Sequence, residues 1–151
     1  MSKPSRPTLI IDGLNVFYRH WAANPTMDSN GEHVGGIVGF IKSLQLLCER
    51  YTPNDMMVVW EGGGSNRRRA IDSNYKKGKR PAKLNRFYED IPDTTQNRNS
   101  QVAQLVALLR KAGVKQLYVP DCEADDIIAY MVSAHFTPSQ KNCVIISTDK
   151  D

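Results

Sequence analysis

The chain has 151 residues, of which 40% are hydrophobic and 24% are charged, which is typical of a globular protein with one core and excludes a disordered tail. Its sequence contains no apolar run near the roughly 20 residues that a membrane-spanning helix needs. The first residues lead into a strand-like run instead of a signal-peptide core, so we expect a soluble, cytoplasmic protein. Cys48, Cys122 and Cys143 form no C-x-x-C pair, which argues against a zinc site and favours reduced thiols.

Charge is segregated along the chain. The net charge is +4, but segment 66–86 alone contains nine Lys or Arg residues and a single acid, Asp72. This segment therefore has a charge of +8, and the rest of the chain sums to −4. A basic block beside an acidic remainder predicts a polyanionic partner for the block and cations for the remainder.

The apolar patterns predict four strands that alternate with helices. In chain order we expect strand 8–11 followed by Asp12-Gly13, helix 35–50, strand 56–60, helix 101–111 stopped by Gly113, strand 117–119, helix 124–134 and strand 143–147. The basic segment shows no clear periodicity. Because each strand is apolar throughout, we expect an α/β fold with a mostly parallel central sheet and helices on both faces.

Acidic residues follow every predicted strand. The carboxyl ends of parallel strands meet at one edge of a sheet, where open α/β folds form their sites. Seven carboxylates at that edge would repel one another unless cations offset their charge. Oxygen ligands without accompanying His or Cys favour Mg²⁺ or Mn²⁺ over zinc. The predicted metal ligands are Asp12, Glu61, Glu123, Asp125, Asp126, Asp149 and Asp151.

Each acidic position also has a simpler structural interpretation. Acids at helix starts are commonly caps. For the E-A-D-D run at 123–126 taken alone, capping is about as good an explanation as metal binding. Asp12-Gly13 taken alone is more typical of a turn. Four strand ends that all carry acids are harder to explain by capping, so the whole pattern favours a metal site.

Four motifs resemble, in order and separation, the nuclease motifs of the flap endonuclease/5′-3′ exonuclease family. They are I-I-D-G-L-N-V-F-Y-R (10–19), V-V-W-E-G-G (58–63), E-A-D-D (123–126) and I-S-T-D-K-D (146–151). The family includes the 5′ nuclease domain of bacterial DNA polymerase I and phage 5′ nucleases sometimes called RNase H. The resemblance implies a PIN-like 5′ nuclease fold and metal-binding roles for the seven acids, although Glu61 stands where the family usually has Asp.

The basic segment also resembles a feature of this family. An Arg lies seven residues before a Tyr-Lys pair that is followed by a further basic residue, and here these are Arg68, Tyr75, Lys76 and either Lys79 or Arg80. The resemblance implies that 62–98 is a basic, arch-like insertion that binds an unpaired 5′ end, within a 5′-3′ exonuclease N-terminal catalytic domain that spans 1–151. Without the flanking motifs, a charge run is more typical of a solvated face.

Tyr18-Arg19 matches a Tyr-Arg pair that follows the first motif and contacts nucleic acid near the scissile phosphate, although Tyr18 is equally compatible with a core position. The resemblance further implies catalytic roles for Asp12, Lys76 and Arg80. In the family the chain continues beyond this point, with two further aspartates and a helix-hairpin-helix element. We therefore expect the sequence to be truncated at its C-terminus.

The resemblance implies a divalent-metal-dependent, structure-specific 5′-3′ exonuclease or flap endonuclease, with two Mg²⁺ or Mn²⁺ ions in the complete protein. Its substrate would be DNA or RNA-DNA with a free 5′ end or 5′ flap, removed during replication in a bacterial or phage-infected cell. Two alternatives stay open at this point. One is a PIN-like ribonuclease, and the other is a catalytically impaired fragment that binds branched DNA.

Overall fold

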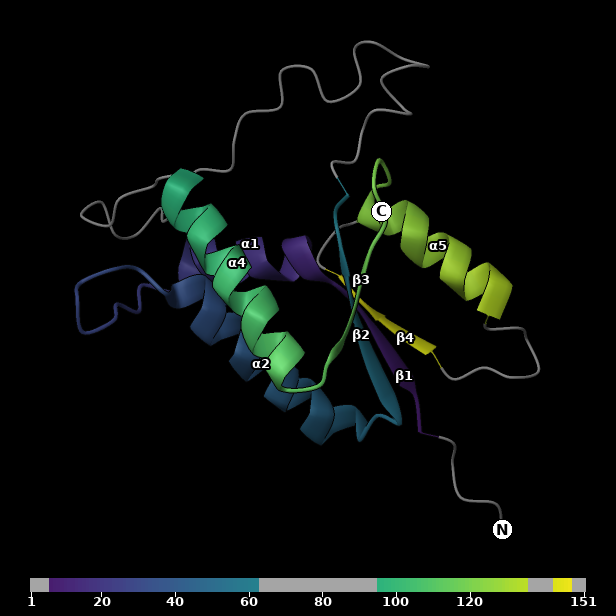
Figure 1. Cartoon of the computed structure of the whole chain (residues 1–151). Coiled ribbons are helices and arrows are strands. Elements are labelled where there is room, and N and C mark those ends of the chain that lie inside the picture. Colours follow the sequence, from purple (N-terminus) through teal and green to yellow (C-terminus); the bar gives the residue numbers. More distant parts are fainter. Residues whose placement is uncertain (1–5, 63–94, 136–142, 148–151) are drawn as a thin grey trace.

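Four parallel strands form the centre of the molecule, in the order β3-β2-β1-β4 (Figure 1). The computed structural model describes residues 6–62, 95–135 and 143–147. The strands are β1 (Thr8–Asp12), β2 (Asp55–Trp60), β3 (Lys115–Tyr118) and β4 (Cys143–Ile146). Each lies within two residues of its predicted position, and the predicted parallel α/β arrangement is confirmed.

Helices cover both faces of this sheet. On one face lie α1 (Gly13–Ala23), α2 (Gly35–Tyr51) and α4 (Thr95–Lys111), and on the other lies α5 (Ala124–His135) (Figure 1). Neighbouring strand residues serve opposite faces, since Ile11 and Val58 pack toward the first group of helices whereas Ile10 and Val59 pack toward α5. Burial on both faces is the reason that these strands are continuously apolar.

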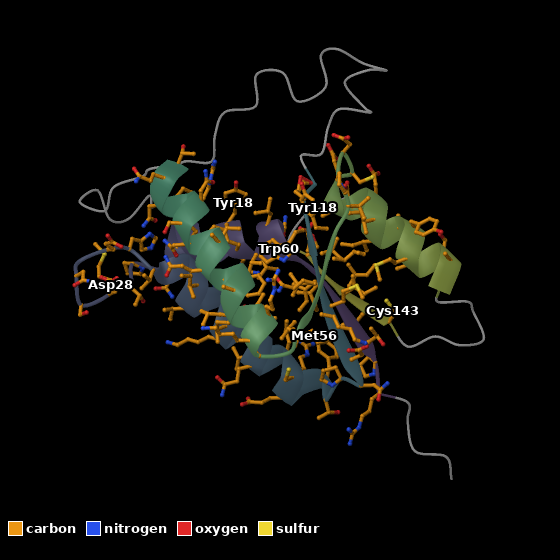
Figure 2. The ribbon with its side chains drawn as sticks, in the orientation of Figure 1. Tyr18, Asp28, Met56, Trp60, Tyr118 and Cys143 are labelled. Carbon is orange, nitrogen blue, oxygen red and sulfur yellow. The ribbon has the colours of Figure 1, made fainter. Side chains whose placement is uncertain are left out.

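The first helix was not predicted. Asp12-Gly13 does not form a turn: Asp12 is the N-cap of α1, and its side chain accepts a hydrogen bond from the Asn15 N–H at 3.3 Å. A Cβ at Gly13 would lie 2.7 Å from the Trp60 ring, so the small residue lets α1 pack closely onto β2. Figure 2 shows Trp60 between the sheet and the helices of this face.

The other predicted helices are confirmed, with one change of boundary. Helix α4 begins at Thr95, six residues before its predicted start, so residues 95–98 of the predicted insertion are helical. The whole of the basic segment 66–86 falls in 63–94, outside the described residues. The three cysteines are free thiols, and burial raises the pKa of the Cys143 thiol. Within the described part of the chain, no helix is long and apolar enough to cross a membrane.

A buried amide on α4 caps helix α2. The N-cap residue of α2, Val34, makes no side-chain capping hydrogen bond. Instead, Gln101 Oε1 accepts hydrogen bonds from the N–H groups of Gly36 at 2.9 Å and Ile37 at 3.2 Å. The Gln101 Nε2 group donates to Asn97 Oδ1 at 2.7 Å, and the Gln101 side chain is 1% exposed. The capping bonds of α2 therefore come from a residue 64 or 65 positions away in sequence.

We predict that Gln101→Leu lowers the free energy of unfolding by about 2 to 4 kcal/mol, because two buried N–H groups lose their acceptor. Urea denaturation followed by circular dichroism measures this change. The matched control is Gln104→Leu on the same helix, whose exposed amide donates a hydrogen bond to Ser100 Oγ at 3.0 Å, and whose expected effect is within about 0.5 kcal/mol. Equal stabilities for the two variants would contradict the capping role of Gln101.

Candidate metal centre

Three of the predicted acids converge beyond the carboxyl ends of β2 and β3. Glu61, Glu123 and Asp125 each offer a carboxylate oxygen, and these atoms lie within 4.8 Å of one another. Glu123 is buried with 2% of its surface exposed, Glu61 is half-buried and Asp125 is exposed. The protein therefore encloses the cluster on the Glu123 side, and solvent reaches it on the Asp125 side.

Backbone contacts of Gly62 bring these acids together. The Gly62 N–H donates to the Cys122 carbonyl at 3.0 Å, and the Asp121 N–H donates to the Gly62 carbonyl at 2.7 Å. A Cβ at Gly62 would lie 1.7 Å from the Val119 carbonyl oxygen, so only glycine allows the two segments to approach this closely. The end of β2, which carries Glu61, is therefore fixed against the loop that carries Glu123.

The start of α5 adds a second link. Glu61 Oε1 accepts a hydrogen bond from the Ala124 N–H at 3.2 Å, and Asp125 Oδ1 accepts one from the Asp126 N–H at 3.1 Å. Both N–H groups belong to the first turn of α5, where the helix dipole favours negative charge. The helix start thus holds two of the three carboxylates in place through backbone hydrogen bonds.

The donor set fits a divalent cation. Oxygen atoms on opposite sides of Mg²⁺ lie about 4 Å apart, so carboxylates within 4.8 Å of one another need only small side-chain rotations to share an ion. Glu123 is a buried acid, and burial of a carboxylate charge is costly unless a cation such as a bound metal ion offsets it. Three oxygen donors without His or Cys suit Mg²⁺ or Mn²⁺.

The other predicted ligands lie elsewhere or outside the described residues. Asp12 ends β1, where it pairs in register with Val59, and it caps α1. Asp126 is exposed on α5. Neither belongs to the group of three. The predicted residues that fall outside the described ranges are Arg68, Tyr75, Lys76, Lys79, Arg80, Asp149 and Asp151.

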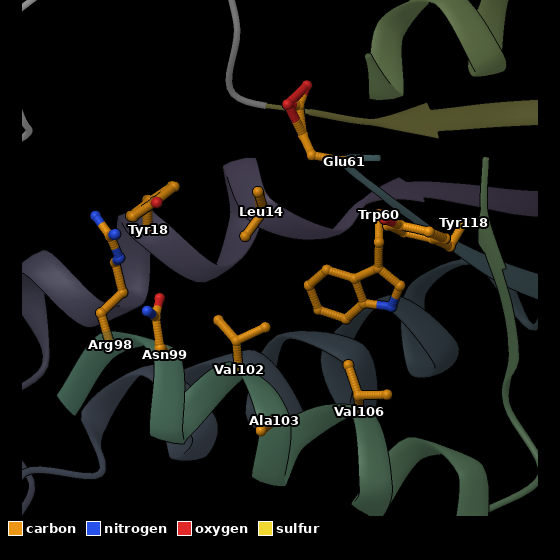
Figure 3. Close-up of a pocket in the computed structure, with 10 residues that line it drawn as sticks. All are labelled: Leu14, Tyr18, Trp60, Glu61, Arg98, Asn99, Val102, Ala103, Val106 and Tyr118. Atoms are coloured by element: carbon orange, nitrogen blue, oxygen red, sulfur yellow. The ribbon is translucent and has the colours of Figure 1, made fainter. Parts of the chain in front are cut away.

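A cavity of about 520 Å³ adjoins the acidic cluster and has Glu61 in its wall (Figure 3). Tyr18 is half-buried there and packs edge-on against Phe17 and Trp21, so it both contacts the core and lines the cavity. Arg19 is exposed. The lining residues are Leu14, Tyr18, Trp60, Glu61, Arg98, Asn99, Val102, Ala103, Val106 and Tyr118.

Arg98 and Asn99 were not among the sequence-predicted site residues. Both lie in the first two turns of α4, before the predicted start of that helix. The Arg98 guanidinium carbon lies 5.7 Å from the centre of the Tyr18 ring, which is a cation–π contact. Nothing in the polar run around Arg98 could have indicated this contact, because its partner is 80 residues away in sequence.

Comparison with known proteins gives consistent matches. Residues 7–151 match the family model described as 5′-3′ exonuclease, N-terminal resolvase-like domain. The chain is 31% identical over 143 residues to a 5′-3′ exonuclease of Aquifex aeolicus (strain VF5), and the match covers 94% of this chain and 45% of that protein. It is also 31% identical over 145 residues to the flap endonuclease Xni of Shewanella halifaxensis (strain HAW-EB4), covering 94% and 50%.

A solved structure has the same fold. The bacteriophage T5 D15 flap endonuclease, in a substituted form crystallised with DNA and metal ions, superposes with a TM-score of 0.60 at 19% identity. The match covers 95% of this chain and 49% of that protein. The chain therefore spans about half the length of the curated relatives and of the solved protein that it matches.

We predict that Gly62→Ala weakens Mn²⁺ binding about 10- to 100-fold, the range typical for losing a group that orients metal ligands. The added methyl must displace the Val119 carbonyl and so separate Glu61 from Glu123. Isothermal titration calorimetry with Mn²⁺ measures the effect.

Gly113→Ala is the matched control for a general loss of stability. Gly113 has a φ of +77° but open space around its Cβ position, so alanine there strains the backbone far from the acids. Its Mn²⁺ affinity should stay unchanged. A folded Gly62→Ala variant with unchanged affinity would show that the Gly62 contacts do not set the carboxylate spacing.

Proposed function

The chain belongs to the family of 5′-3′ exonucleases with an N-terminal resolvase-like domain, and from this premise we propose that it is the N-terminal catalytic part of a divalent-metal-dependent, structure-specific 5′ nuclease. The convergence of Glu61, Glu123 and Asp125 at the carboxyl edge of a parallel sheet carries this proposal. The domain would span 1–151, with 62–98 as its basic insertion.

The reaction is hydrolysis of a phosphodiester, in which a water oxygen bonds to phosphorus, the bond to the 3′-oxygen breaks, and that oxygen takes up a proton. Glu61, Glu123 and Asp125 would hold one Mg²⁺ or Mn²⁺ ion, and the complete protein would hold two. When bound, such ions supply activation of water and stabilisation of charge on the leaving oxygen. Their further ligands would be Asp12, Asp126, Asp149 and Asp151.

Basic residues would bind and orient the substrate strand. The excess of Lys and Arg in segment 66–86 supports a polyanionic partner. Lys76 and Arg80 would stabilise negative charge on the scissile phosphate. The remaining proposed contacts to nucleic acid are Tyr18, Arg19, Arg68, Tyr75 and Lys79.

The proposed substrate is DNA or RNA-DNA with a free 5′ end or a 5′ flap, and the proposed role is removal of primers or flaps during replication in the cytoplasm of a bacterial or phage-infected cell. The names of the relatives, which are 5′-3′ exonucleases and flap endonucleases, support this substrate class. A PIN-like ribonuclease would instead cleave RNA internally without needing a free 5′ end. An impaired fragment would bind branched DNA and leave it intact.

We predict that Glu123→Gln and Asp125→Asn each reduce cleavage of a labelled 5′-flap duplex at least about a hundredfold. Each substitution removes a charged ligand of an ion that would stabilise the transition state by several kcal/mol. DNA binding should persist, since these side chains hold cations. Cleavage is measured with Mg²⁺, Mn²⁺ or EDTA. Glu49→Gln, at an exposed acid on α2, is the matched control and should leave the rate unchanged.

Each rival has its own signature in the same assay. Cleavage by both variants at the parent rate would overturn the metal-site assignment. Faster cleavage of internal RNA than of free 5′ ends would favour the PIN-like ribonuclease. Tight flap binding without cleavage at any metal concentration would favour the impaired fragment.

We predict that replacing Lys76, Lys79 and Arg80 by Ala flattens the dependence of log K on log salt concentration. Each lost phosphate contact reduces the slope by roughly 0.7 to 0.9, so three lost contacts reduce it by roughly 2 to 3. Fluorescence anisotropy of a labelled flap across a salt series measures the slope. An unchanged slope would mean that this segment is a solvated face.

A further inference from the structure

Arg98 lines the same cavity as Glu61 and lies beside Tyr18, on the opposite side of the cavity from Trp60 and Tyr118 (Figure 3). Arg98 is half-buried and its guanidinium lies over the Tyr18 ring at 5.7 Å. No carboxylate within the described ranges lies at ion-pair distance from it. The contact with the Tyr18 ring positions the guanidinium. Its positive charge favours binding of an anion, and the described carboxylates do not supply one.

The position of Arg98 on its helix strengthens this preference. Arg98 is the fourth residue of α4, whose first turn contains no acid. Positive charge near a helix N-terminus is opposed by the helix dipole, whereas an anion bound there is favoured by both the dipole and the guanidinium. The basic residues at the other end of the helix, Arg110 and Lys111, have the opposite, favourable arrangement.

The lining of the cavity that Arg98 and Glu61 share suits a segment of a polynucleotide strand. Its wall is largely apolar: Leu14 lies between Arg98 and Glu61, and Val102 and Trp60 continue the apolar lining (Figure 3). A strand along this wall would present a base or sugar to the apolar surface and a phosphate to each charged group. A cation held by the acids would face one phosphate, and the guanidinium would face the other.

We propose that Arg98 binds a backbone phosphate of the same nucleic-acid strand whose neighbouring phosphate lies at the acidic cluster. This inference rests on the proposed function and adds to it a contact from α4, C-terminal to the Lys- and Arg-rich segment 66–86. Arg98 suits this role better than lysine, because its planar guanidinium can rest on the Tyr18 ring and still direct two N–H groups to phosphate oxygens. Tyr18 is then a positioning residue for Arg98.

The test is binding of a 3′-labelled single-stranded oligonucleotide in EDTA, where cleavage is absent, measured by fluorescence anisotropy across a salt series. Arg98→Gln should weaken binding about tenfold and reduce the salt slope by roughly 0.7, the value for one phosphate contact on a single strand. Arg98→Lys should keep the slope while binding more weakly. Arg110→Gln, at an exposed arginine of the same helix, is the matched control and should change neither value.

The role of Tyr18 is tested by a double-mutant cycle. Tyr18→Phe keeps the aromatic ring and with it the contact to the guanidinium, whereas Tyr18→Leu removes that contact. If Tyr18 acts through Arg98, Tyr18→Leu should cost much less in the Arg98→Gln background than in the parent chain. Additive losses would overturn the positioning role.

Two further results would overturn the proposal itself. An unchanged salt slope in Arg98→Gln, with lowered thermal stability, would make Arg98 a packing residue only. Displacement of the oligonucleotide by equimolar 5′-mononucleotide would assign the site to free nucleotides and not to a strand. Failure of the nuclease assay is distinguishable from both, because binding is measured in EDTA without cleavage, and a slope change in Arg98→Gln would persist in a chain that cleaves nothing.

Discussion

The candidate site depends on one constraint, which is that β2 and β3 end at the same level and are joined there by Gly62. Trp60 pairs in register with Tyr118, and two backbone hydrogen bonds then connect Gly62 to the residues before Glu123. These hydrogen bonds hold the backbones that carry Glu61 and Glu123 close together, so that the two carboxylates lie within reach of one ion. The absence of a side chain at Gly62 permits that approach, so a glycine with no ligand atom of its own determines whether the acids form a site.

Helix α4 connects the core to the Arg98 side of the cavity. Gln101 is buried and caps α2, while Asn97 accepts hydrogen bonds from the Trp21 indole at 3.3 Å and from Gln101 at 2.7 Å. Arg98 lies beside these two anchored residues on the same helix. The position of the guanidinium is therefore set by a buried polar network, and a fold-stabilising interaction also orients a surface cation toward the cavity.

Much of this fold could be predicted from sequence because buried parallel strands leave a continuous apolar signal. The acids after β2 and β3 were also predictable as a set, since strand ends of a parallel sheet meet at one edge. Helix α1 was missed because Asp12-Gly13 is a common turn signal, although here Asp12 is a cap. The first turns of α4 were missed because their order comes from contacts made by Asn97 and Gln101 with distant residues, which leave no local pattern. The roles of Asp149, Asp151 and the basic segment stay predictions.

The two charged groups of the cavity must stay apart for either to bind a ligand. If the Arg98 guanidinium paired with Glu61, each charge would offset the other, so the acid would attract a cation less strongly and the guanidinium would attract a phosphate less strongly. The Tyr18 ring provides an alternative partner that attracts the guanidinium without neutralising it. Glu61 meanwhile accepts a hydrogen bond from the Ala124 N–H, which holds it toward Glu123 and Asp125. Each charge is thus oriented by a neutral partner, which leaves both available to opposite charges from outside the protein.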